Sequence, residues 1–401
     1  EGGRVQFLEP SPHRAGSAYY AVHRFLLGDY RPYIYRTDDY GQSWMLLTDG
    51  TNGIPADWPT RVVREDPDRE GLLYAGTEFG LFISFDNGAH WQSFQQNLPN
   101  VPVADLKVFR KDLIVGTQGR SFWVLDNLSA LHQIEPGTAS ADVHLYAPRA
   151  GYRTRDGAAF VGPTVEYYLG AVPAGPVTID ILDARGDLVN SYSSGAGAPS
   201  ARGAAANTPE SMMMAGRGGR GGGARTAPVT RYEGHNRWVW NVQHESGLGA
   251  PPGDYQVRLT VGSTTLTEPL EVLIDPRLAE EGLTAADLQE QFQHNLTMRA
   301  MVAEVNDLVT RVRGALERME GATGAEARTR DSLQAVAEKL ITGPIRYSQP
   351  GLQTHISYLA GMTSRVDQKV GRDAFERYEV LRAELDELTA AVNQLLGTGE
   401  I

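Results

Sequence analysis

The chain has 401 residues, of which 41% are hydrophobic and 21% charged, and its formal net charge is −12. This composition is ordinary for a globular protein of about two to four domains, and the acidic balance argues against a general nucleic-acid binder. The chain contains no cysteine, which excludes disulfides, thiolate nucleophiles and cysteine metal ligands.

The first residues, Glu1-Gly2-Gly3-Arg4, include no initiator methionine and no signal-peptide pattern, and repeat-like sequence follows at once. We therefore expect the chain to be a fragment or a processed product of a longer protein. No apolar run approaches the ~20 residues that are needed to span a bilayer.

One short pattern, [S/T]-x-D-x-G-x-x-W, occurs twice in residues 1–135. The first turn motif is residues 37–44 and the second is residues 84–91, with their aspartates 47 positions apart. In such a turn a carboxylate accepts backbone N–H bonds, a glycine adopts positive φ, and a tryptophan packs the turn onto its sheet. The structural residues of the two motifs are Thr37, Asp39, Gly41, Trp44, Ser84, Asp86, Gly88 and Trp91.

A third, degenerate unit follows the two motifs. Gly76-Thr77 recurs as Gly116-Thr117, 40 residues later, although the motif itself is lost. A period of this size is typical of β-propeller blades. About three blades are recognisable, fewer than the four that a closed propeller needs, so residues 1–135 predict an incomplete propeller.

Residues 142–274 predict a β-sandwich. Short alternating segments such as 177–182 and 255–261 are bounded by turn residues, which favours a single antiparallel sandwich. Residues 195–228 interrupt it with a Gly-, Ala-, Ser- and Arg-rich run whose composition cannot bury enough apolar surface to fold.

Residues 276–398 predict an antiparallel helical bundle. Thr284 and Asp287 have the spacing of a capping box, and apolar residues then recur at three- and four-residue steps, as in 298–319 and 378–395. Glycine and proline separate four such stripes, and the short connections between them imply antiparallel packing.

The turn motifs resemble the Asp-box of sialidase-, sortilin- and xyloglucanase-type propellers. Segment 250–259 of the sandwich resembles fibronectin-III-like accessory domains. With its turn motifs, sandwich and helical tail, the chain as a whole resembles the C-terminal part of secreted bacterial sortilin-like or BNR-repeat proteins, which are often labelled glycosyl hydrolases. The resemblance implies an extracellular or periplasmic location. It also implies that each turn motif is a structural hairpin that lies away from the ligand-binding face.

Two interpretations of Asp39 and Asp86 compete. A glycosidase needs two carboxylates about 5–9.5 Å apart, whereas the turn motif gives each aspartate a structural role within its own blade. We favour the structural role. The candidates for a ligand face are instead Glu78 and Arg120, which follow the Gly-Thr pairs in corresponding loops of adjacent units, together with Phe79 and Trp123.

The nine histidines are scattered and none has the spacing of a metal site, so the sequence predicts neither a metal nor a cofactor. The favoured function is a binding scaffold for a protein or glycan. The alternative is a glycoside hydrolase whose catalytic carboxylates lie mostly in blades outside this chain. A third possibility is a subunit whose propeller is completed by another chain.

Overall fold

The computed structural model describes residues 2–154, 162–195, 228–343 and 348–397. Most of the 195–228 insertion therefore lies outside the described residues. The chain is multidomain, with several antiparallel sheets followed by C-terminal helices, and it divides into two compact units, Glu1–Pro136 and Gly137–Ile401.

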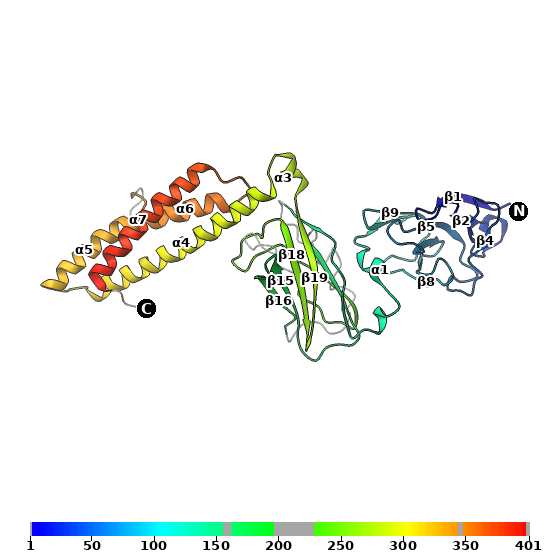
Figure 1. The fold of residues 1–401 in the computed structure, drawn as a ribbon, viewed down its shortest axis with the longest axis horizontal. Coiled ribbons are helices and arrows are strands. Elements are labelled where there is room, and N and C mark those ends of the chain that lie inside the picture. The colour runs from blue at the N-terminus through cyan, green and yellow to red at the C-terminus, as the bar shows by residue number, and fades with distance from the viewer. Residues whose placement is uncertain (1, 155–161, 196–227, 344–347, 398–401) are drawn as a thin grey trace. The chain divides into compact units, whose positions relative to one another are not determined.

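The first unit contains three antiparallel sheets, each built from consecutive strands (Figure 1). The first sheet is β1 (Arg4–Pro10), β2 (Ala18–His23), β3 (Ile34–Thr37) and β4 (Met45–Leu46). The second sheet is β5 (Thr60–Glu65), β6 (Leu73–Thr77), β7 (Leu81–Ser84) and β8 (Gln92–Ser93). The third sheet is β9 (Val103–Phe109), β10 (Asp112–Thr117) and β11 (Phe122–Leu125), and the short helix α1 (Ser129–Gln133) follows it.

The second sheet is the middle layer of this unit. Successive side chains of a strand point to opposite faces, and in β6 Leu73 and Ala75 join the core shared with the first sheet, whereas Tyr74 joins the core shared with the third. Every residue of β6 and β7 is buried. Because β6 and β7 are apolar on both faces, the second sheet packs against the first sheet on one side and against the third sheet on the other.

Arg64, on β5, links all three sheets. Its guanidinium donates to the Glu9 carboxylate of the first sheet at 2.6 Å, and to the Asp105 carboxylate and the Leu106 carbonyl of the third sheet, both at 2.8 Å. Because the guanidinium is planar and presents several donors, one side chain satisfies partners on both sides.

Two further sheets in the second unit share one hydrophobic core. The smaller sheet is β12 (Val143–Leu145), β14 (Thr164–Leu169) and β17 (Gly234–Val239). The larger has the order β13 (Gly151–Arg153), β19 (Thr264–Ile274), β18 (Gly253–Val261), β15 (Val177–Asp183) and β16 (Leu188–Ser193). The arrangement departs from the expected antiparallel one at a single pair, because β13 runs parallel to β19.

Four long helices, α4 (Ala285–Arg318), α5 (Ala325–Leu340), α6 (Leu352–Ser364) and α7 (Arg372–Leu396), follow the short helix α3 (Pro276–Glu280). Their apolar stripes form one core. The predicted capping box is present: the Thr284 hydroxyl accepts from the Asp287 N–H at 3.1 Å, and the Asp287 carboxylate accepts from the Thr284 N–H at 3.0 Å.

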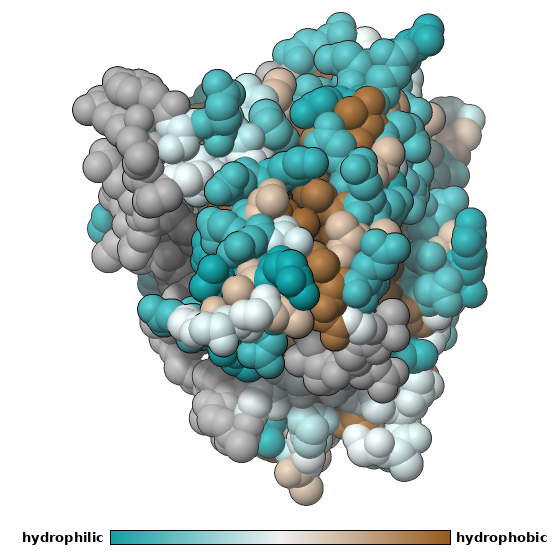
Figure 2. Space-filling view, turned by 90° about the vertical axis from the view of Figure 1, so that its left-hand side faces the viewer, coloured by the Kyte–Doolittle hydropathy of each residue, from teal (hydrophilic) through white to brown (hydrophobic). Residues whose placement is uncertain are grey.

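The face shown in Figure 2 is mostly hydrophilic, with hydrophobic residues gathered mainly in a strip down its middle. This pattern is expected of helices that each bury one face. Among the described helices, none has the length and apolar character that crossing a membrane requires.

Candidate functional site

The first turn motif uses its aspartate within the turn. One Asp39 carboxylate oxygen accepts from the Ser43 N–H at 2.9 Å, and the other accepts from the Ser43 hydroxyl at 2.6 Å. Thr37 donates its hydroxyl to Asp39 at 2.8 Å and accepts from the Gly41 N–H at 2.9 Å. The hydrogen bonds, that from the Ser43 side chain above all, lower the pKa of Asp39 to about 2.

The second turn motif repeats this network. Asp86 accepts from the Ser84 hydroxyl at 2.9 Å and the His90 N–H at 2.8 Å, and His90 Nδ1 contacts its second oxygen at 2.6 Å. Burial raises the pKa of Asp86, but these hydrogen bonds outweigh it and the net shift is downward. Both carboxylates therefore act as ionised hydrogen-bond acceptors within their own turns.

Each tryptophan of the motifs packs its turn onto a sheet. Trp44 contacts the Tyr20 ring edge-on, with centroids 4.4 Å apart, and Trp91 is buried in the core between the first two sheets. Gly88, at φ +86°, sits so close to Leu47 that a Cβ would lie 2.8 Å from its side chain. Glycine is required there both for the backbone conformation and for the close approach.

The opposite strand ends carry the candidate ligand-face loops, which connect β2 to β3, β6 to β7 and β10 to β11. We refer to these three connections, residues 24–33, 78–80 and 118–121, as the loop end. Consecutive antiparallel strands alternate direction, so the loop end and the turn motifs lie at opposite ends of the sheets.

Glu78, at the loop end, is already paired. Its carboxylate accepts from His23 Nε2 at 2.8 Å and from the Arg61 guanidinium at 2.6 Å, and its side chain is 16% exposed. Burial lowers the pKa of His23, although the contact with Glu78 opposes the effect. The structure thus places Glu78 in a charged cluster that joins the first and second sheets.

The other three candidates differ in exposure. Phe79 is 41% exposed and rests on Trp58, with ring centroids 5.1 Å apart. Arg120 is exposed, whereas the Trp123 ring packs partly against the core between the second and third sheets and donates its N–H to the Arg120 carbonyl at 3.0 Å. Phe79 and Arg120 are consequently the candidates whose side chains are open to a partner.

Both flanking sheets of the first unit present apolar side chains on the face turned away from the middle sheet. On the first sheet this face includes Val5 and Leu8, which are 51% and 58% exposed. On the third sheet it includes Phe122, 81% exposed, and Val124, 60% exposed, which pair with Gly116 and Ile114. We call these surfaces the first and third outer faces.

One group of potential metal ligands occurs among the described residues. Asp66 and Asp68, in the turn after β5, and His132, on α1, place their ligand atoms within 4.8 Å of one another. The spacing of the histidines gave no sign of this group, because Asp66 and His132 are 66 positions apart.

No protein-family model and no curated protein matches the chain. Partly similar solved structures include the GH74 enzyme of Niastella koreensis (13% identity, TM-score 0.26, 41% of this chain and 26% of that one). A second is PorZ, a surface component of the type-IX secretion system of Porphyromonas gingivalis (13% identity, TM-score 0.24, 67% and 39%). A third is an ancestral GH74 enzyme (12% identity, TM-score 0.25, 68% and 36%).

The chain thus spans between 26% and 39% of the lengths of these structures. Similarity at this level carries no inference about residues, ligands or activity, so the function rests on the geometry of the chain itself.

Proposed function

We propose that the first unit is three consecutive blades of an Asp-box β-propeller, belonging to an exported, non-catalytic binding scaffold for a protein or glycan. One observation carries the choice of a scaffold over an enzyme. The carboxylates of Asp39, Asp86 and Glu78 are all engaged by partners in their own unit, whereas Phe79 and Arg120 are exposed.

The layering of the sheets supports the propeller part of this proposal. A middle sheet that is buried on both faces and flanking sheets with apolar outer faces form a repeating stack that is open at both ends. Burial of apolar area provides about 25 cal/mol per Å². The outer faces are accordingly suited to further blades, supplied by a longer form of this protein or by another chain.

The loop end supports the binding part. Aromatic and arginine side chains are the residue types most enriched where proteins contact partners. The ion-paired cluster of Glu78, His23 and Arg61 beneath Phe79 holds the β6–β7 loop in place without leaving an unpaired charge. Phe79 and Arg120 therefore offer a fixed aromatic anchor and an exposed cation on neighbouring blades. We further propose that the second unit acts as a spacer and docking element for this surface.

A glycan panel assayed for both binding and hydrolysis tests the scaffold against the hydrolase. We expect saturable binding without hydrolysis, weakened on the order of tenfold by combined Phe79→Ala and Arg120→Ala, which corresponds to about 1.4 kcal/mol. Tyr40→Ala is the matched control, because Tyr40 is 81% exposed but lies in a turn motif at the opposite strand ends. Hydrolysis abolished by a single carboxylate substitution would overturn the scaffold in favour of the hydrolase.

A further inference from the structure

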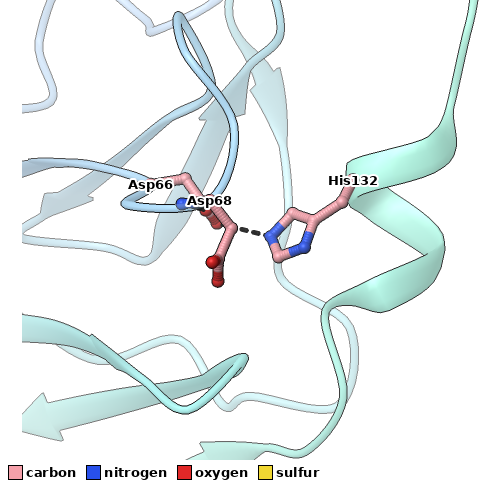
Figure 3. A group of neighbouring side chains, drawn as sticks. All are labelled: Asp66, Asp68 and His132. Carbon is pink, nitrogen blue, oxygen red and sulfur yellow. Dashed lines mark hydrogen bonds and ion pairs between the residues drawn. The ribbon is translucent and has the colours of Figure 1, made fainter. Parts of the chain in front are cut away.

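The turn after β5 faces the short helix α1 across the first unit (Figure 3). Asp66 is fully buried, and its carboxylate contacts His132 Nε2 at 2.9 Å. Asp68 is exposed and lies two residues further along the same turn. The three side chains come from two segments that only the folded chain brings together.

Hydrogen bonds hold the Asp66 carboxylate in a single orientation. One oxygen accepts from the N–H groups of Asp68 and Arg69, at 2.8 and 3.2 Å, and the other accepts from the Tyr74 hydroxyl at 2.9 Å. Supporting hydrogen bonds of this kind orient the carboxylate ligands of metal sites. The second oxygen is thereby directed towards His132.

The helix α1 is held just as firmly. The Arg69 guanidinium donates to the carbonyls of Leu131 and Ile134, on either side of His132. The imidazole of His132 is only partly exposed. Its position opposite Asp66 is therefore set by the backbone as well as by its own contact.

The charges of this group do not balance. Among the described residues, the Asp68 carboxylate has no hydrogen-bond or ion-pair partner, and one imidazole faces two carboxylates whose ligand atoms lie within 4.8 Å of its own. The Arg69 guanidinium adds a positive charge nearby, but it is engaged by the Leu131 and Ile134 carbonyls and, among the described residues, pairs with neither carboxylate. A divalent cation would neutralise both carboxylates.

We propose that Asp66, Asp68 and His132 form a binding site for a divalent transition-metal ion, with Zn²⁺ the best match. A set of one imidazole and two carboxylates suits zinc, which takes both ligand types and keeps an open position for water when three protein ligands are present. Zinc–ligand bonds of 2.0–2.2 Å place tetrahedral ligand atoms about 3.3 Å apart. The Asp66–His132 contact needs to lengthen only slightly, and Asp68 swings inward from solvent.

Metal binding would replace the hydrogen bond between His132 and Asp66. The ion takes the Nε2 lone pair, so the coordinated imidazole carries its proton on Nδ1. The site would join α1 to the turn after β5 through a coordinate bond. It is independent of the proposed binding at the loop end, which involves other residues.

Calorimetric titration of the full chain with Zn²⁺, after removal of metal with a chelator, tests the site. We expect saturable binding of one equivalent, and a loss of at least about tenfold in affinity for Asp68→Asn and for His132→Ala. Asp68→Asn changes only an exposed side chain, so it keeps the test valid even if His132→Ala disturbs the fold.

The matched control is His90→Ala, which removes the histidine of the exposed His90–Asp86 pair, for which the described part of the chain offers no third ligand. This variant should bind Zn²⁺ as the unsubstituted chain does. Three results would overturn the site: no saturable binding, binding that survives both Asp68→Asn and His132→Ala, or binding that His90→Ala removes. A stronger response to Ca²⁺ than to Zn²⁺ would also overturn it, because an all-oxygen preference leaves no role for His132.

Discussion

The helical bundle and the three sheets of the first unit bury their apolar residues to very different extents. The four long helices direct their stripes into one shared core, and few large hydrophobic residues remain outside. The first unit is about a third of the chain, yet among the described residues it holds thirteen of the twenty large hydrophobic side chains that are exposed. The described helices thus cover one another's apolar stripes, whereas the first and third outer faces leave apolar side chains exposed.

The largest expected effect comes from the bundle core. Leu385→Ala, at a fully buried position on α7, should lower the free energy of unfolding of the bundle by about 3 kcal/mol, because it removes apolar contacts and leaves a cavity. Calorimetry should show the transition of the bundle moving to lower temperature while that of the first unit stays in place. An equal shift of both transitions would show that the bundle is not independent of the sheets.

A pH-dependent effect of intermediate size is expected from His294 on α4. This side chain is 5% exposed, its Nε2 has no hydrogen-bond partner among the described residues, and its ring packs against Phe375. Burial lowers the pKa of His294, only partly offset by the charge of Glu290. The folded bundle therefore binds this proton less readily than the unfolded chain does.

The direction of the pH dependence follows from linkage. The contribution of His294 to stability is complete above its unfolded pKa of about 6.5 and is lost as the pH falls from there towards the lower folded value. His294→Leu should flatten the bundle's loss of stability between neutral and mildly acidic pH, measured by denaturant titration. His355→Leu, on α6, is the control, and equal pH profiles for both variants would count against the assignment.

The smallest effect on stability is expected on the third outer face. Phe122→Ser combined with Val124→Ser should change the free energy of unfolding of the isolated chain by less than about 0.5 kcal/mol, since both side chains are exposed. Leu113→Ala, on the buried face of the same sheet, should cost several times more.

The same double substitution should have a clear effect on assembly. If the third outer face is made for a covering sheet, the unsubstituted chain should self-associate as its concentration rises, and the variant should do so less, as sedimentation equilibrium can measure. If the chain stays monomeric at every concentration, the exposed third outer face does not drive association, and it would then differ from the surface of the bundle in composition only.

Sequence predicted best those structural elements whose defining residues lie close together in the chain. Thr284 and Asp287 are three positions apart, so the start of α4 was readable, and the helices followed from their periodicity. The strands β12 and β13 are hard to predict from sequence, because three residues each are too few to show an alternating pattern.

Contacts between distant segments could not be predicted in the same way. Glu78 was correctly assigned to a loop, but its pairing with His23 and Arg61 depends on how two sheets stack. The Asp66–Asp68–His132 group depends on the path of the chain after β11. Neither follows from residue spacing, because the partners meet only after the sheets have packed.

The guanidinium of Arg64 gives the first unit a mechanical property. Since one side chain is bonded to Glu9 on one neighbouring sheet and to Asp105 on the other, tension applied to either outer sheet is transmitted across the middle one. Separating either outer sheet from the middle one therefore breaks a charge-assisted hydrogen bond of this guanidinium. In the proposed role of an exported binding scaffold, where shear acts on whatever is bound, this shared guanidinium would help the three sheets to respond as one unit.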